Sequence, residues 1–128
     1  MAKAVHDDVL DAMLNYIADN TKRLTVCNAQ PTTYTEGNAT FALADVTTTE
    51  GVAGASFDIA NGDTSGRKLT VTQNASIPVD TSGTATHVAL LDVDNSKLLY
   101  VTTCTSQALT SGNTVTVPAW DIEISDPS

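Results

Sequence analysis

Apolar residues follow two different periods along this chain, a helical one near the beginning and a strand-like one after it. Between residues 5 and 19, apolar side chains recur at positions three and four apart, which predicts one amphipathic α-helix. These side chains are Val9, Leu10, Met13, Leu14 and Ile17. A helix this short is stabilised mainly by tertiary packing, so we expect its apolar stripe to dock on the protein's own sheets or on a neighbouring subunit.

From residue 24 to residue 125, short runs of apolar and β-branched residues alternate with turn residues, which predicts strands. The predicted strands cover residues 24–27, 41–46, 57–59, 68–73, 77–79, 86–93, 97–104, 115–117 and 120–124. Residues 47–56 are rich in Thr and Gly and predict a mobile loop. The chain is therefore predicted to be a single mainly-β domain over residues 1–128, an antiparallel β-sandwich or jelly roll with one short N-terminal α-helix.

Two local patterns make the prediction for the C-terminal strands more specific. Residues 88–91 and 98–101 are apolar at almost every position, which is typical of central strands with both faces covered, and the turn residues 94–96 between them indicate a hairpin. In the last two predicted strands, the apolar residues fall on positions of opposite parity: odd numbers in residues 115–117 and even numbers in residues 120–124. Because a one-residue shift moves every side chain to the other face, Pro118 predicts a bulge or a kink between them.

The composition supports a mainly-β fold and argues against two classes of binding partner. The chain has 128 residues, of which 21 are Thr, a residue suited to pleated, half-buried surface. Its net charge is −9 and its only adjacent basic pairs are Lys22-Arg23 and Arg67-Lys68, so nucleic acid and anionic membranes are not expected as partners. No apolar run approaches the ~20 residues of a membrane span, and no signal pattern is evident, so synthesis in the cytoplasm is expected. Cys27 and Cys104 are expected to be reduced, packed thiols rather than a disulfide.

The sequence offers little chemistry. The two histidines, His6 and His87, have no close ligand or catalytic partner in the chain. Residues 62–68 (GDTSGRK) have the wrong spacing for a phosphate loop, and the acids that follow Asp92 lack the glycine and the closing acid of a calcium loop. The sequence thus predicts turns at both places, and a protein that is not an enzyme, with no metal site and no cofactor.

Residues 82–125 resemble a family of small structural proteins from tailed bacteriophages, described as virion structural, decoration or tail-fibre-like proteins. The similarity lies in three motifs: a T-H-V-A-L strand leading into an acidic hairpin, its L-L return strand, and a final G-N-T-x-x-x-P-A strand. They correspond here to residues 86–90, 98–103 and 112–119. All three motifs concern packing, so the resemblance implies a lineage more directly than an activity.

The resemblance implies a place in the phage particle, with two roles open. The favoured role is a capsid decoration (cement) protein that bridges subunits of the major capsid protein, as a symmetric dimer or trimer. The alternative is a tail- or fibre-associated protein that binds a host glycan, for which Trp120 is the candidate stacking residue. The candidate interface residues are Leu10, Leu14, Ile17, Tyr100 and Trp120.

Overall fold

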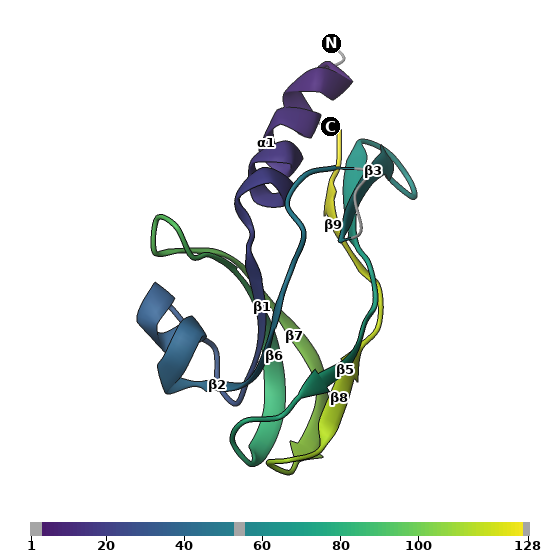
Figure 1. The fold of residues 1–128 in the computed structure, drawn as a ribbon. Coiled ribbons are helices and arrows are strands. Elements are labelled where there is room, and N and C mark those ends of the chain that lie inside the picture. The colour runs from purple at the N-terminus through teal and green to yellow at the C-terminus, as the bar shows by residue number, and fades with distance from the viewer. Residues whose placement is uncertain (1–3, 53–55, 127–128) are drawn as a thin grey trace. The chain divides into compact units, whose positions relative to one another are not determined.

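The computed structural model describes residues 4–52 and 56–126 and confirms a mainly-β fold with antiparallel sheets and one N-terminal α-helix (Figure 1). The chain forms two compact units that are interleaved along the sequence. The first contains the described parts of Met1–Asn20, Thr49–Gln73 and Pro118–Ser128, and the second contains Thr21–Thr48 and Asn74–Val117. Neither unit is one continuous stretch of chain, and the single domain and the sandwich arrangement stay predictions.

The first unit is a helix packed on a three-stranded antiparallel sheet. Its elements are α1 (Asp7–Asn20), β3 (Phe57–Asn61), β4 (Arg67–Val71) and β9 (Trp120–Ile124), with the strand order β3-β4-β9. The helix contacts β4 and β3. Its buried side chains are Leu10, Leu14 and Ala18, and those of the sheet are Phe57, Leu69, Val71 and Ile122. The predicted helix is thus confirmed, and it docks on the protein's own sheet.

The second unit contains a four-stranded antiparallel sheet. Its strands are β1 (Arg23–Cys27), β2 (Ala42–Thr47), β6 (Gly83–Asp92) and β7 (Lys97–Leu109), in the order β2-β1-β6-β7. The predicted hairpin at residues 94–96 is confirmed as the β6–β7 connection. The prediction that residues 98–101 form a central strand is wrong, because β7 ends the sheet. Apolar runs predict burial on both faces but not the position of a strand within its sheet.

A two-stranded ribbon and a short helical turn complete the second unit. The ribbon pairs β5 (Asn74–Pro78) with β8 (Thr114–Val117) and adjoins β2 through a bridge between Val79 and Ala44. The π-helical turn η1 (Glu36–Thr40) lies near a cluster of Cys27, Ala89 and Leu91. Four partly buried side chains pack against that cluster: Tyr34, Phe41, Leu98 and Val101.

The predicted kink at Pro118 is confirmed as a break between two strands. Residues 118 and 119 belong to neither β8 nor β9. Before the break the chain pairs with β5, and after it the chain pairs with β4, so the change of parity coincides with a change of sheet. The predicted loop over residues 47–56 includes residues 53–55, which lie outside the described residues.

Candidate functional site

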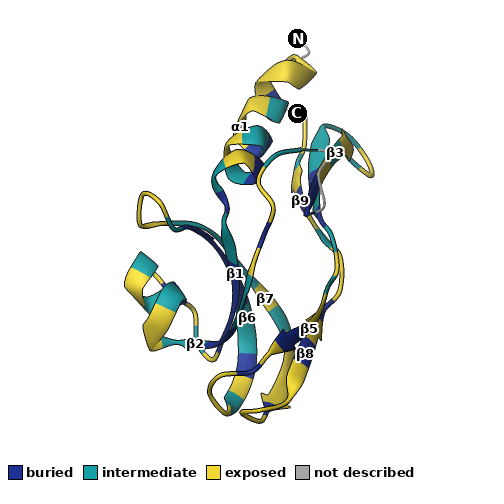
Figure 2. Ribbon diagram, in the orientation of Figure 1, coloured by how far each residue is buried: buried dark blue, intermediate teal, exposed yellow. Residues whose placement is uncertain are grey.

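Helix α1 has an exposed apolar face beside the face that docks on the sheet. Val9, Met13 and Tyr16 are 55%, 54% and 48% exposed, and their spacing of four and three residues places them on one side of the helix. We call these three residues the helix stripe. Figure 2 shows that α1 carries both buried and exposed positions along its length. A surface helix normally hides its apolar residues, so an exposed row of this kind marks a candidate contact surface.

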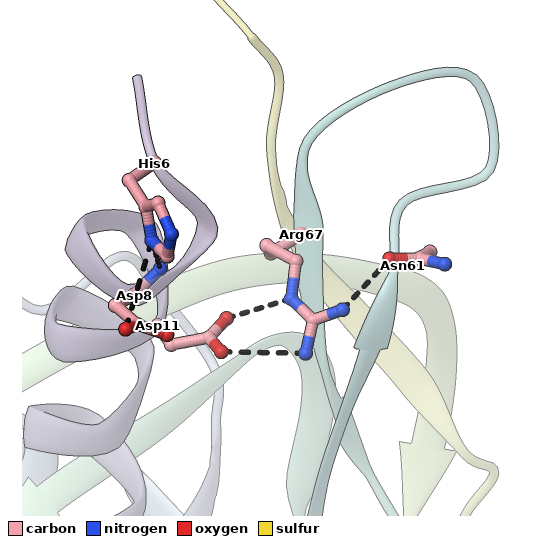
Figure 3. Close-up of polar contacts among 5 residues, drawn as sticks. All are labelled: His6, Asp8, Asp11, Asn61 and Arg67. Atoms are coloured by element: carbon pink, nitrogen blue, oxygen red, sulfur yellow. Dashed lines mark hydrogen bonds and ion pairs between the residues drawn. The ribbon is translucent and has the colours of Figure 1, made fainter.

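An ion pair fixes α1 on its sheet and so orients the helix stripe. The Nε and Nη2 atoms of Arg67 donate to the two carboxylate oxygens of Asp11 at 2.7 and 3.3 Å, and Nη1 donates to Oδ1 of Asn61 at 2.7 Å (Figure 3). The side chains of Arg67 and Asp11 are 19% and 22% exposed. The hydrogen bonds to Asp11 raise the pKa of Arg67 further above its usual value. Two parallel bonds restrict rotation better than one, so the pair holds the helix in one orientation on β4.

His6 directly precedes α1 and has no catalytic partner among the described contacts. Its Nδ1 accepts a hydrogen bond from the backbone N–H of Asp8 at 3.1 Å, and its carbonyl oxygen accepts one from Val9 at 3.0 Å. Figure 3 shows the His6 ring beside Asp8 at the start of α1. Both interactions satisfy backbone donors at a helix N-terminus, which is a structural role.

Asp92 closes the β6–β7 hairpin instead of opening a calcium loop. One carboxylate oxygen accepts from the Asn95 backbone N–H at 3.1 Å and the other from the Asn95 side-chain amide at 2.9 Å. These bonds favour the ionised carboxylate and lower the pKa of Asp92. The residue is 1% exposed. Because both oxygens serve the turn, the carboxylate stabilises the geometry from which β7 starts.

Residues 62–66 form the predicted turn between β3 and β4, and Arg67 and Lys68 already belong to β4. The Gly62 N–H donates to the Gly66 carbonyl at 2.9 Å, which closes the loop. The Asp63 N–H donates to Glu123 at 2.6 Å, and the Lys68 ammonium donates to Asp63 at 2.8 Å. These three donors are therefore used within the fold.

Cys27 and Cys104 are free thiols, and burial raises the pKa of both, so each is protonated at neutral pH. Within residues 4–52 and 56–126, no three His, Cys, Asp or Glu side chains gather as metal ligands. In the same residues, no helix has the length and apolar character to cross a membrane.

The structure shows how far each residue suggested by the sequence for an interface is buried. Leu10 and Leu14 are buried in the first unit, so they offer no surface to another protein, and Ile17 is half-buried beside them. Tyr100 is half-buried on β7 opposite Leu90, and Trp120 is half-buried at the start of β9.

The sequence predicted only part of the helix stripe. Val9 and Met13 belong to the predicted apolar stripe, but periodicity alone does not divide that stripe into a docked half and an exposed half. Tyr16, three residues after Met13, was missed. The sequence did contain a signal for the exposed helix stripe. The apolar face of the helix is wider than one small sheet can cover.

Comparisons with known proteins return no significant match to a family model, to a curated protein or to a solved structure.

Proposed function

We propose that this protein is a non-enzymatic structural component of a tailed-phage particle, assembled in the host cytoplasm, that decorates the capsid and bridges subunits of the major capsid protein. The observation that carries the proposal is the resemblance of residues 82–125 to phage structural proteins. These residues form the β6–β7 hairpin, β8 and β9 in the structure, so the motifs lie on framework strands. A role based on packing also agrees with a fold whose polar clusters serve turns and helix docking.

The helix stripe is the surface that we assign to the capsid contact. Its three apolar side chains lie beside the exposed acids Asp8 and Asp19, on a protein with a net charge of −9. The matching surface on the capsid protein is therefore an apolar patch bordered by Lys or Arg. Repetition on an icosahedral lattice allows each contact to be modest, because avidity adds over many copies.

A pair of helix variants tests this assignment. Met13→Glu places a charge within the helix stripe, whereas Asn15→Glu places the same charge at a half-buried helix position that is not three or four residues from any member of the stripe. Glu is a good helix former, so both variants should fold. We expect Met13→Glu to reduce binding to particles that lack the protein by at least about tenfold, because a charge must then be desolvated at the contact.

The matched variant decides how the result is interpreted. Asn15→Glu should bind particles as the unchanged protein does, measured by co-sedimentation with particles and with circular dichroism to verify the fold. Equal binding by all three proteins would show that the helix stripe is not the capsid contact. Equal loss in both variants would point to a general effect of added negative charge.

A tail- or fibre-associated protein with glycan binding is the second candidate. The observation in its favour is Trp120, the single tryptophan, which is half-buried rather than buried, so the residue keeps some accessible surface. Stacking of a sugar on an indole needs an accessible face. The number of copies per particle separates this role from decoration, because a tail has far fewer equivalent positions than a shell.

A further inference from the structure

Strand β7 is an edge strand of unusual length. It has 13 residues, and the four-stranded sheet ends with it. At the opposite edge, the chain itself covers β2: Val79 bridges Ala44, and the N–H groups of Asp80 and Thr81 donate to the Leu43 carbonyl at 2.8 and 3.1 Å. Within the described chain, no strand pairs with the outer edge of β7. The sheet therefore has one protected edge and one open edge.

The open edge lacks the charges that normally protect such strands. Soluble proteins place Lys, other charges or Pro on exposed edges to prevent pairing with another chain. From Leu98 to Trp120 this chain has no Asp, Glu, Lys or Arg. The β6–β7 pairing is irregular on both sides of Tyr100–Thr103, but within this segment four consecutive residues pair with β6 without a shift. This short, regular and neutral segment is suited to accept another strand.

The side chains of β7 also suit a strand inside a sheet. Leu98, Leu99, Tyr100 and Val101 are all half-buried, although consecutive residues of a strand point to opposite faces. Apolar character on both faces was the reason that the sequence predicted a central strand here. A second strand beside β7 would give these residues the surroundings that their sequence indicates.

We propose that the outer edge of β7 pairs antiparallel with β7 of a second copy of this chain, which joins the two four-stranded sheets across a twofold axis near Val101 and Thr102. Charge favours a second copy as the occupant. Two molecules of net charge −9 repel each other over most approaches, but the uncharged run lets two β7 strands meet without a like-charge pair. Antiparallel pairing of identical strands is also self-complementary, as a twofold interface requires. The inference stands whether or not the protein belongs to a phage particle.

The test compares a charge at this edge with the same charge elsewhere on the sheet. Thr103→Lys changes an exposed residue of the pairing segment, and Thr84→Lys changes an exposed residue of the inner strand β6, away from that segment. Sedimentation velocity from micromolar to millimolar concentration should show the unchanged protein and Thr84→Lys associating from 13.3 kDa monomers to dimers. Thr103→Lys should raise the dimer dissociation constant at least about tenfold, since each copy then carries an ammonium group on the pairing edge, opposite Tyr100 of the other copy, and pairing must partly desolvate that charge.

Hydrogen exchange in the unchanged protein gives a second measurement that needs no variant. Amide exchange within residues 100–103 should slow as the concentration rises and the dimer forms, because edge N–H groups then become bonded. A protein that stays monomeric at millimolar concentration overturns the proposal. A dimer that Thr103→Lys leaves intact, with unchanged exchange in residues 100–103, also overturns it and places the self-contact elsewhere.

Discussion

Replacing Leu14 with Ala is expected to lower the free energy of unfolding of the first unit by about 2–5 kcal/mol. Leu14 is fully buried in the layer between α1 and the sheet of β3, β4 and β9. Truncation removes its transfer free energy and leaves a cavity that the neighbouring strands fill only in part. Urea denaturation followed by tryptophan fluorescence measures the effect, because Trp120 on β9 belongs to this unit.

The adjacent residue provides the control. Met13 is 54% exposed, so Met13→Ala should change the free energy of unfolding by no more than about 0.5 kcal/mol. Similar losses for the two variants would contradict the docking of α1 through Leu10, Leu14 and Ala18. Deletion of residues 1–20 extends the test: it exposes Phe57, Leu69 and Val71, so the first unit should lose its cooperative transition.

Replacing Gly66 with Ala is the second change with a large expected effect. Gly66 has φ of +73°, and a Cβ built there would clash with the backbone carbonyl oxygen of Ile124 on β9. The left-handed conformation costs a non-glycine residue about 1–2 kcal/mol, and the displacement of β9 adds to it. We therefore expect a loss of more than about 2 kcal/mol in the free energy of unfolding, measured as for Leu14.

The variant Gly112→Ala separates the cost of the left-handed backbone conformation from the cost of the steric clash. Gly112 has φ of +92°, but a Cβ there would meet nothing within 4 Å. Gly112→Ala should thus show the conformational cost alone, about 1–2 kcal/mol, followed by circular dichroism. If both variants lost the same stability, the close approach of the β3–β4 turn to β9 would not contribute.

Local pattern predicted most of the elements in this fold. The helix over residues 7–20 follows from apolar spacing, and the strand over residues 67–71 follows from the alternation of polar and apolar residues. The break at Pro118 follows from a change of parity. All of these depend on neighbours within a few residues, and such neighbours are visible in the sequence.

Partners distant in the chain account for what the sequence did not predict. The edge position of β7 is decided by which strands pair with β6, and one of them, β1, lies far earlier in the chain. Likewise, the pairing of Asp11 with Arg67 and the division of the apolar helix face depend on how α1 meets β4. These features depend on contacts between residues far apart in the sequence. They define the helix stripe and the outer edge of β7, the two surfaces that we assign to contacts.

Counting the protein in purified phage particles tests the central claim most directly. A capsid decoration protein occupies a site that an icosahedral shell repeats many times, so quantitative mass spectrometry should find roughly hundreds of copies per particle. A tail or fibre component has only a few equivalent positions. About a dozen copies or fewer, or none, would contradict the decoration role.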